Sequence, residues 1–101
     1  MRLAIVSACS AGIASTYMAA EALEMAARKR QHWVKAETQG TLGIENEISP
    51  QEAASVDVVI FAADISIQRK ERFAGKPLLE VGVAAAIRQA ESIIERAEKL
   101  V

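Results

Sequence analysis

Cysteine is nearly absent from this chain of 101 residues, which contains one, Cys9, and a single histidine, His32. One thiol cannot form a disulfide within the chain, and two such side chains are too few for a four-ligand structural zinc site. The sequence therefore excludes a disulfide-stabilised scaffold and a zinc finger, and the low cysteine content is typical of a reducing compartment.

Aromatic residues, excess charge and long hydrophobic runs are also scarce. Aromatic side chains make up 4% of the chain, and the formal net charge is −1, which argues against a nucleic-acid partner. The longest apolar run, 58–63, is far shorter than the ~20 residues of a membrane helix, and the run 3–6 is too short for a signal peptide. We therefore expect a cytoplasmic protein without direct membrane insertion.

Hydrophobic residue types are abundant, at 51% of the chain, but twenty of them are alanines. Alanine buries little area, so few large side chains remain to form a core. A chain of this length is expected to form one compact domain, residues 1–101. The many alanines predict helices packed closely on a small sheet.

Apolar segments alternate with helical patterns along the chain. Apolar runs predict strands at 3–6, 56–63 and 77–81, and alternation of residue types predicts a further strand at 33–39. Helices are predicted from residue 12 or 13 to 30, from a capping box at 49–52, and over 83–99, with a turn at 40–43 and a loop at 65–75. This order predicts an α/β fold: an open four-stranded parallel sheet with helices on both faces, a Rossmann-like three-layer sandwich.

Ligands of such folds bind beyond the carboxyl ends of the strands, so the segment after the first strand is the main candidate site. Cys9 lies there, ahead of a helix N-terminus that favours the thiolate and offers free N–H groups to a phosphate. A cysteine phosphatase would carry an arginine six residues later, where this chain has Ser15. The pattern therefore favours a carrier that retains a phosphoryl group. The expected phosphate-binding residues are Ser10, Ala11, Gly12, Ile13, Ala14, Ser15 and Thr16.

Other polar residues have weaker patterns. Glu37 and Asp64 fall at or near strand ends, where they could form the rim of the site or serve as solvated or capping carboxylates. His32 is predicted on the opposite side of the sheet, where a solvated turn residue is favoured over a phosphorylated one. A charged loop face is favoured over a partner contact for four basic residues: Arg69, Lys70, Arg72 and Lys76.

Residues 9–23, which read Cys-Ser-Ala-Gly-Ile-Ala-Ser-Thr-Tyr-Met-Ala-Ala-Glu-Ala-Leu, resemble the phosphocysteine loop and first helix of a bacterial family. The resemblance resumes at 37–40, 43–47, 62–64 and 72–77. The family is the fructose-type enzyme IIB component of the phosphoenolpyruvate-dependent sugar phosphotransferase system.

The resemblance implies that Cys9 accepts a phosphoryl group from a phosphohistidine of enzyme IIA and passes it to a sugar bound by the membrane-embedded enzyme IIC. The implied activity is that of a protein-N(pi)-phosphohistidine–sugar phosphotransferase acting on a fructose-like hexose, without a metal or cofactor. The implied location is cytoplasmic, with peripheral association with the inner membrane through enzyme IIC.

The loop departs from the usual fructose-type pattern, Cys-Pro-Thr-Gly-Ile-Ala-His-Thr, because Ser10, Ala11 and Ser15 replace the proline, the threonine and the histidine. It is closer to the loops of cellobiose- and mannitol-type IIB components, which use the same cysteine chemistry. The carrier role is therefore retained, and the sugar stays open. The alternative is a regulatory or thiol-redox-sensing relative that binds partners without phosphorylating sugar.

Overall fold

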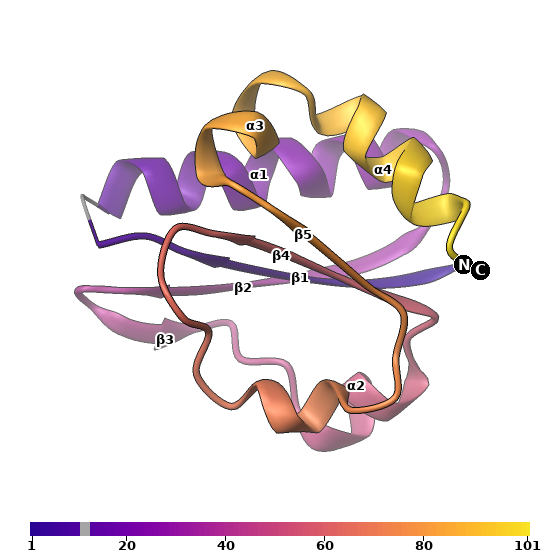
Figure 1. Cartoon of the computed structure of the whole chain (residues 1–101), viewed down its shortest axis with the longest axis horizontal. Helices are drawn as coiled ribbons and strands as arrows, with labels where there is room; N and C mark the ends of the chain where they lie inside the picture. The colour runs from indigo at the N-terminus through magenta and orange to yellow at the C-terminus, as the bar shows by residue number, and fades with distance from the viewer. Residues whose placement is uncertain (11–12) are drawn as a thin grey trace.

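The computed structural model describes residues 1–10 and 13–101, which contain a five-stranded sheet of order β3-β2-β1-β4-β5 (Figure 1). Neighbouring strands are parallel except for β3, which runs antiparallel to β2. The strands are β1 (Arg2–Ala8), β2 (Trp33–Gly40), β3 (Gly43–Glu45), β4 (Val58–Ala63) and β5 (Leu78–Val81).

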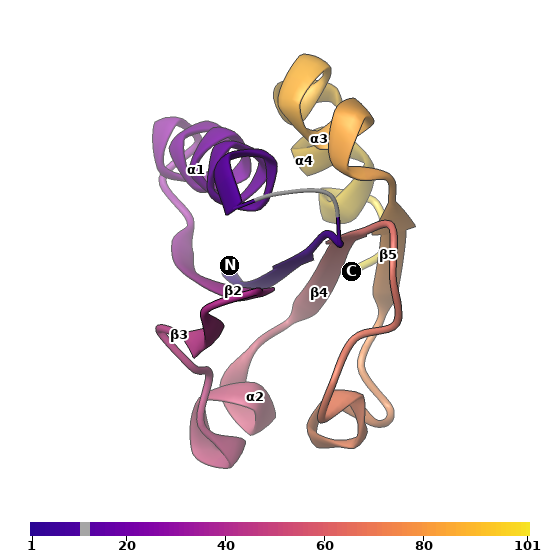
Figure 2. The same cartoon turned by 90° about the vertical axis from the view of Figure 1, so that its left-hand side faces the viewer.

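Helices lie on both faces of this sheet, as Figures 1 and 2 show. One face is covered by α1, α3 and α4, and the other by α2 and the short 3-10 helix η1. Their bounds are α1 (Ile13–Lys29), α2 (Pro50–Ser55), η1 (Lys70–Phe73), α3 (Val83–Arg88) and α4 (Ala90–Glu98). The predicted α/β class, an open sheet with helices on both faces, is confirmed.

The central strand β1 supplies both hydrophobic cores because its side chains alternate between the faces. Leu3 and Ile5 point to the α1 side, where alanines of α1 pack against the sheet. Ala4 and Val6 point to the other side, which also contains Phe61 and Phe73 in edge-to-face contact, with ring centroids 5.8 Å apart. The alanine-rich surface of α1 therefore allows the close helix–sheet packing that composition predicts.

Two features differ from the sequence-based expectation. The predicted turn at 40–43 is a hairpin, in which Gly40 pairs with Gly43 and β3 becomes a fifth strand. Gly43 has a φ of 91°, a conformation that glycine adopts without strain. The predicted helix 83–99 is divided at Gln89, whose φ and ψ are −129° and 36°. Residues 83–99 contain no glycine or proline, so the sequence gives no local signal of this break.

The predicted capping box is confirmed at the start of α2. The Glu52 N–H donates to Ser49 Oγ at 3.1 Å, and the Ser49 N–H donates to Glu52 Oε1 at 2.9 Å, with Pro50 at the first helical position. These bonds satisfy backbone donors that a helix otherwise leaves free.

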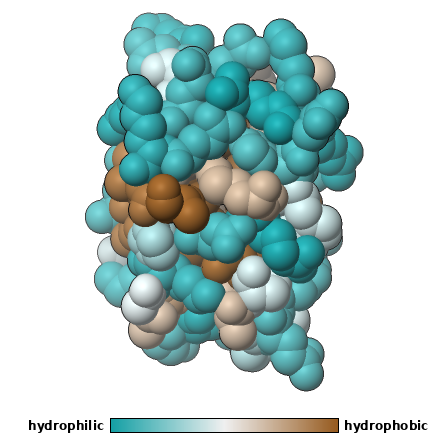
Figure 3. Space-filling view, turned by 90° about the vertical axis from the view of Figure 1, so that its right-hand side faces the viewer, coloured by the Kyte–Doolittle hydropathy of each residue, from teal (hydrophilic) through white to brown (hydrophobic). Residues whose placement is uncertain are grey.

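Both chain termini lie at the end of the sheet where the parallel strands begin (Figure 1). Figure 3 views that end, whose surface is mostly hydrophilic with a hydrophobic area near its middle. The opposite end, where the parallel strands finish, is the end that faces the viewer in Figure 2.

Candidate functional site

The register of β1 and β4 brings Cys9 and Asp64 together. Ala8 at the end of β1 pairs with Ala63 at the end of β4, and Cys9 and Asp64 are the residues that directly follow these two strands. The Asp64 N–H donates to the Ala8 carbonyl at 3.0 Å, which extends the pairing beyond β4. After β1 the chain forms β2 on one side of it, and it later forms β4 on the other side. The carboxyl end of β1 is therefore the switch point of the sheet, the place at which α/β folds bind ligands.

Cys9 is 5% exposed and lies just beyond the carboxyl end of β1, ahead of α1. Its Sγ donates to Asp64 Oδ2 at 3.9 Å. Asp64 itself is exposed, whereas Cys9 is buried. Of the two carboxylates predicted at the rim, Asp64 is therefore the one that reaches Cys9.

The segment that follows Cys9 is described in part. Ser10 and Ala14 are exposed, Ser15 is partly exposed, and Thr16 is buried. Ser7 Oγ donates to the Thr16 carbonyl at 2.9 Å and so ties β1 to the first turns of α1. The expectations for Ala11, Gly12 and the Ile13 side chain fall outside the described residues.

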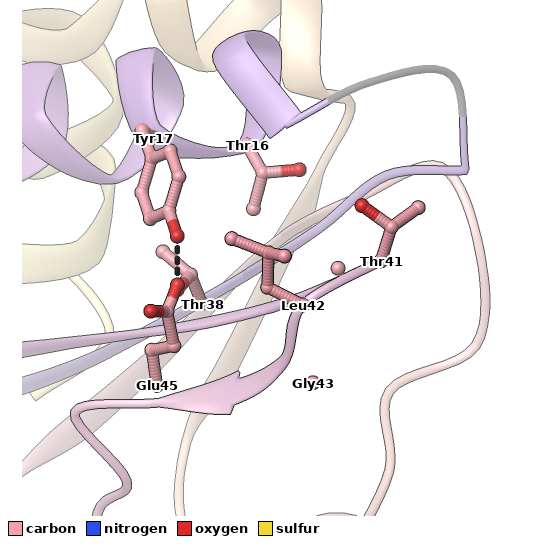
Figure 4. Close-up of a pocket in the computed structure, with 8 residues that line it drawn as sticks. Thr16, Tyr17, Thr38, Thr41, Leu42, Gly43 and Glu45 are labelled. Atoms are coloured by element: carbon pink, nitrogen blue, oxygen red, sulfur yellow. Dashed lines mark hydrogen bonds between the residues drawn. The ribbon is translucent and has the colours of Figure 1, made fainter.

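The β2–β3 hairpin forms a wall next to the start of α1. A small pocket lies between them, lined by residues that include Thr16, Tyr17, Thr41 and Leu42 (Figure 4). The Tyr17 hydroxyl donates to Glu45, which links α1 to β3. The unpredicted fifth strand therefore contributes to the surroundings of the candidate site.

Glu37 does not line the rim, nor is it a solvated carboxylate, because the structure buries it completely on the face of the sheet opposite α1. Arg72 Nη1 donates to Glu37 Oε1 at 2.6 Å, and Arg72 Nη2 donates to Oε2 at 2.8 Å. The Ile48 N–H and Gln39 Nε2 each donate to this carboxylate at 2.7 Å. Burial alone would raise the pKa of Glu37, but these hydrogen bonds together hold it below its ordinary value.

The predicted charged loop face is wrong for Arg72, whose side chain is 6% exposed. Besides holding Glu37, its guanidinium donates to the Ile48 carbonyl at 2.6 Å and to the Arg69 carbonyl at 2.8 Å. The signal that could have identified this pair is Glu37 itself, because a carboxylate within a buried strand needs a cation or several donors.

Gln39 fixes the segment between Asp64 and η1. Its side-chain amide donates to the Gln68 carbonyl at 3.0 Å and accepts the Gln68 N–H at 2.8 Å. The side chain thus bonds to Gln68 as a neighbouring strand would. This two-point attachment was not predicted from the sequence.

His32 lies at the opposite end of the sheet from Cys9, because the next residue, Trp33, pairs with Arg2 at the start of β1. The expectation that it is solvated is wrong, since its side chain is 13% exposed. The Met1 ammonium lies 3.2 Å from Nδ1 and Glu98 Oε2 lies 2.5 Å from Nε2. These contacts give His32 a structural role between the two chain ends.

Within residues 1–10 and 13–101, no group of His, Cys, Asp or Glu side chains is arranged to hold a metal ion. None of the helices in this part of the chain is both long and apolar enough to cross a membrane.

Comparison with known proteins identifies the family. Residues 4–96 match the model of the "PTS system, Lactose/Cellobiose specific IIB subunit" family. This match spans most of the chain, which therefore belongs to the IIB family of the sugar phosphotransferase system.

Curated relatives are of the fructose-like type. The chain is 46% identical over 97 residues to the PTS system fructose-like EIIB component 2 of Escherichia coli, a match that covers 96% of this chain and 92% of the relative. It is 50% identical over 92 residues to the 2-O-alpha-mannosyl-D-glycerate-specific EIIABC component of the same species, covering 91% of this chain and 14% of that protein. The first relative is thus a protein of similar length, and the second is a much longer one.

Solved structures show the same fold. A domain of a fructose-specific IIABC component from Borrelia burgdorferi superposes with a TM-score of 0.92 at 38% identity, covering 97% of this chain and 93% of that one. A predicted fructose-specific IIB from Escherichia coli superposes with a TM-score of 0.92 at 33% identity, covering 98% and 88%. The chain is therefore a IIB component of the fructose-like type, with a role in sugar phosphotransfer.

Proposed function

We propose that this chain is a phosphocysteine carrier in which Cys9 is transiently phosphorylated. The observation that carries the proposal is the position of Cys9, directly after β1 at the switch point and ahead of α1. Membership of the IIB family supports it. The proposed carrier is one domain, residues 1–101.

In the first transfer, Cys9 Sγ attacks the phosphorus of a phosphohistidine on enzyme IIA. The sulfur–phosphorus bond forms as the phosphorus–nitrogen bond breaks, and the thiol proton ends on the donor's imidazole. The phosphoryl oxygens would be bound by residues 10–16, with N–H groups at the start of α1 as donors. The contribution of the protein is positioning and electrostatic stabilisation.

In the second transfer, a hydroxyl of a sugar held by enzyme IIC attacks the phosphorus. The sulfur–phosphorus bond breaks, the hydroxyl proton replaces it on the sulfur, and the sugar phosphate is released. This cycle is a protein-N(pi)-phosphohistidine–sugar phosphotransferase activity, carried out in the cytoplasm with peripheral association with the inner membrane through enzyme IIC.

The sugar that we propose is a fructose-like hexose, because the relatives that match over nearly their whole length carry that name. A direct test supplies phosphorylated carrier to membranes that contain the cognate IIC, with fructose or 2-O-α-mannosyl-D-glycerate as acceptor. Phosphorylation of the second compound alone would overturn the choice of hexose and leave the carrier role intact.

The carrier role is tested with phosphorylated enzyme IIA and three forms of the chain: wild type, Cys9→Ser and His32→Gln. We expect the wild type and His32→Gln to gain a phosphoryl group whose ³¹P resonance is that of a thiophosphate ester, and Cys9→Ser to gain none. Glutamine at 32 retains an amide that can donate to Glu98, and circular dichroism verifies that each variant is folded.

Two results would contradict the proposal. Label that survives Cys9→Ser would show that another residue is phosphorylated. A wild type that accepts no phosphoryl group would overturn the carrier function and favour a regulatory or redox role for Cys9.

A further inference from the structure

The carboxylate of Asp64 is held in place from two sides. Its Oδ1 accepts the N–H of Val83, the first residue of α3, at 3.2 Å, while its Oδ2 accepts the Cys9 thiol at 3.9 Å. The backbone of Asp64 is bonded to β1 through the Ala8 carbonyl. Asp64 therefore faces the sulfur because two segments hold it there, the end of β1 with Cys9 and the start of α3.

The loop that follows Asp64 is fixed as well. Gln39 holds Gln68 by two hydrogen bonds, and Arg72 at η1 is anchored to the buried Glu37. Both ends of the segment from Asp64 to η1 are thus tied to the sheet. Their attachment restricts how far Asp64 can move from Cys9.

The other charged side chains that line the same cleft as Asp64 carry no net positive charge. The cleft that Asp64 lines also contains Lys70 and Glu80, one cation and one anion. At α3, the partner of Asp64 is a backbone N–H, which carries no full charge. Asp64 is thus the carboxylate in contact with the sulfur, and a phosphoryl group on that sulfur would lie beside it.

Like charges at such separations repel, and the repulsion weakens with screening by salt. A neutral thiol donates to the Asp64 carboxylate, whereas a thiolate or a phosphoryl group, which carries up to two negative charges, is disfavoured beside it. The same contact that stabilises the unloaded carrier therefore opposes the loaded one.

We propose that Asp64 sets how readily Cys9 gives up its phosphoryl group, by stabilising the protonated thiol and repelling the phosphoryl group. This inference rests on the proposed carrier function and adds a residue that tunes it. The bonds that form and break are those of the two transfers above, and Asp64 changes their equilibrium without entering them covalently.

The first test needs no partner protein. The rate of alkylation of Cys9 by iodoacetamide is measured against pH for the wild type, Asp64→Asn and Asp57→Asn. Asparagine keeps an oxygen that can accept the Val83 N–H and removes the charge. We expect Asp64→Asn to be alkylated faster than the wild type at neutral pH, because the negative charge that opposes the thiolate is gone, and the difference to shrink in 1 M salt.

Asp57→Asn is the matched control. Asp57 is also exposed and also accepts a backbone N–H, that of Arg2 at 2.7 Å, but it lies next to the start of β1 at the other end of the sheet. Its alkylation profile should coincide with that of the wild type. An Asp64→Asn profile that also coincides with the wild type, in a protein shown to be folded by circular dichroism, would overturn the inference.

The second test measures the equilibrium of phosphoryl exchange between enzyme IIA and each variant. We expect Asp64→Asn to favour the phosphorylated carrier by about five- to tenfold relative to the wild type. An unchanged equilibrium in a carrier that accepts phosphate would overturn the role of Asp64 and leave the carrier function standing. If no variant accepts phosphate, the carrier function fails, and the Asp64 charge effect is still decided by the alkylation profiles. If Asp64→Asn does not fold, Asp64→Ser replaces it, since serine also offers an uncharged oxygen.

Discussion

Replacing Arg72 by methionine is expected to destabilise the fold by about 3–5 kcal/mol, because it leaves the Glu37 carboxylate buried without its cation. Glu37 is 0% exposed and Arg72 is 6% exposed, so water cannot take the place of the guanidinium. Against a total stability of about 5–15 kcal/mol, this loss is large. It is measured as the free energy of unfolding in urea, followed by circular dichroism.

Arg69→Met is the matched control for Arg72→Met. Arg69 lies three positions earlier and pairs with Glu47, but its side chain is 59% exposed. An exposed pair contributes less than about 1 kcal/mol. If the two arginine variants lost similar free energies, or if Arg72→Met lost less than about 1 kcal/mol, the reasoning about burial would be refuted.

A conservative substitution and a double variant protect this test against simple misfolding. Arg72→Lys keeps the charge without the two-point contact and should lose less than Arg72→Met. The double variant Glu37→Gln/Arg72→Met should lose about 1–3 kcal/mol less free energy of unfolding than the sum of the losses of the two single variants, because both members of the ion pair are removed together.

The pH dependence of Glu37 has a definite sign. Its pKa is lower in the folded chain than in the unfolded one, so its contribution is complete above the unfolded pKa, about 4.3. That contribution is lost as the pH falls toward the folded pKa. The stability gap between the wild type and Glu37→Gln should therefore be widest at neutral pH and should narrow below about pH 4.

Three further predictions concern local features. Ser49→Ala should lower the free energy of unfolding in urea by about 1 kcal/mol through loss of the capping box. Ser92→Ala, at an exposed position in α4, should change it by less than about 0.5 kcal/mol. Equal effects of the two substitutions would contradict the role of the cap. Hydrogen bonds from Arg30 and His32 lower the pKa of Glu98 to about 2, so a ¹³C NMR titration of its carboxyl carbon should have its midpoint near that value. The stabilising effect of Glu98 should fade as the pH falls from about 4.3 toward 2. A midpoint above 4 would refute this prediction. Gly43→Ala should cost about 1 kcal/mol in thermal unfolding because of its φ of 91°, although nothing lies within 4 Å of the added carbon; an unchanged melting temperature would show that the hairpin tolerates the strain.

Local patterns in the sequence predicted the parts of the fold that depend on local physics. Apolar runs located β1, β4 and β5, and alternation of residue types located β2. Ser49 with Glu52 located the start of α2. Strands and capped helices have such patterns within a few residues. The hairpin at Gly43 was not predicted, since β3 is a short strand of three residues. The break at Gln89 was not predicted either, because no glycine or proline stands there to mark the end of a helix.

At the candidate site, too, local patterns predicted which residues matter but not the contacts between residues far apart in the sequence. Cys9 was identified from its place after a strand and before a helix, and Asp64 from its place at a strand end. The contact between them depends on the register of β1 with β4, which no local pattern specifies. Glu37 was wrongly expected at the rim or in solvent, because its partner Arg72 lies 35 residues away and is brought to it only by the folded chain.

The contacts of His32 with Met1 and Glu98 have a practical consequence for handling the protein. They keep the beginning of the chain and α4 side by side at the end of the sheet remote from Cys9 (Figure 1). An affinity tag or surface linker attached at either end would thus immobilise the molecule with the Cys9 end of the sheet facing away from the support. Such a preparation presents that end of the sheet uniformly to a partner protein in solution, which suits kinetic measurements on a sensor chip.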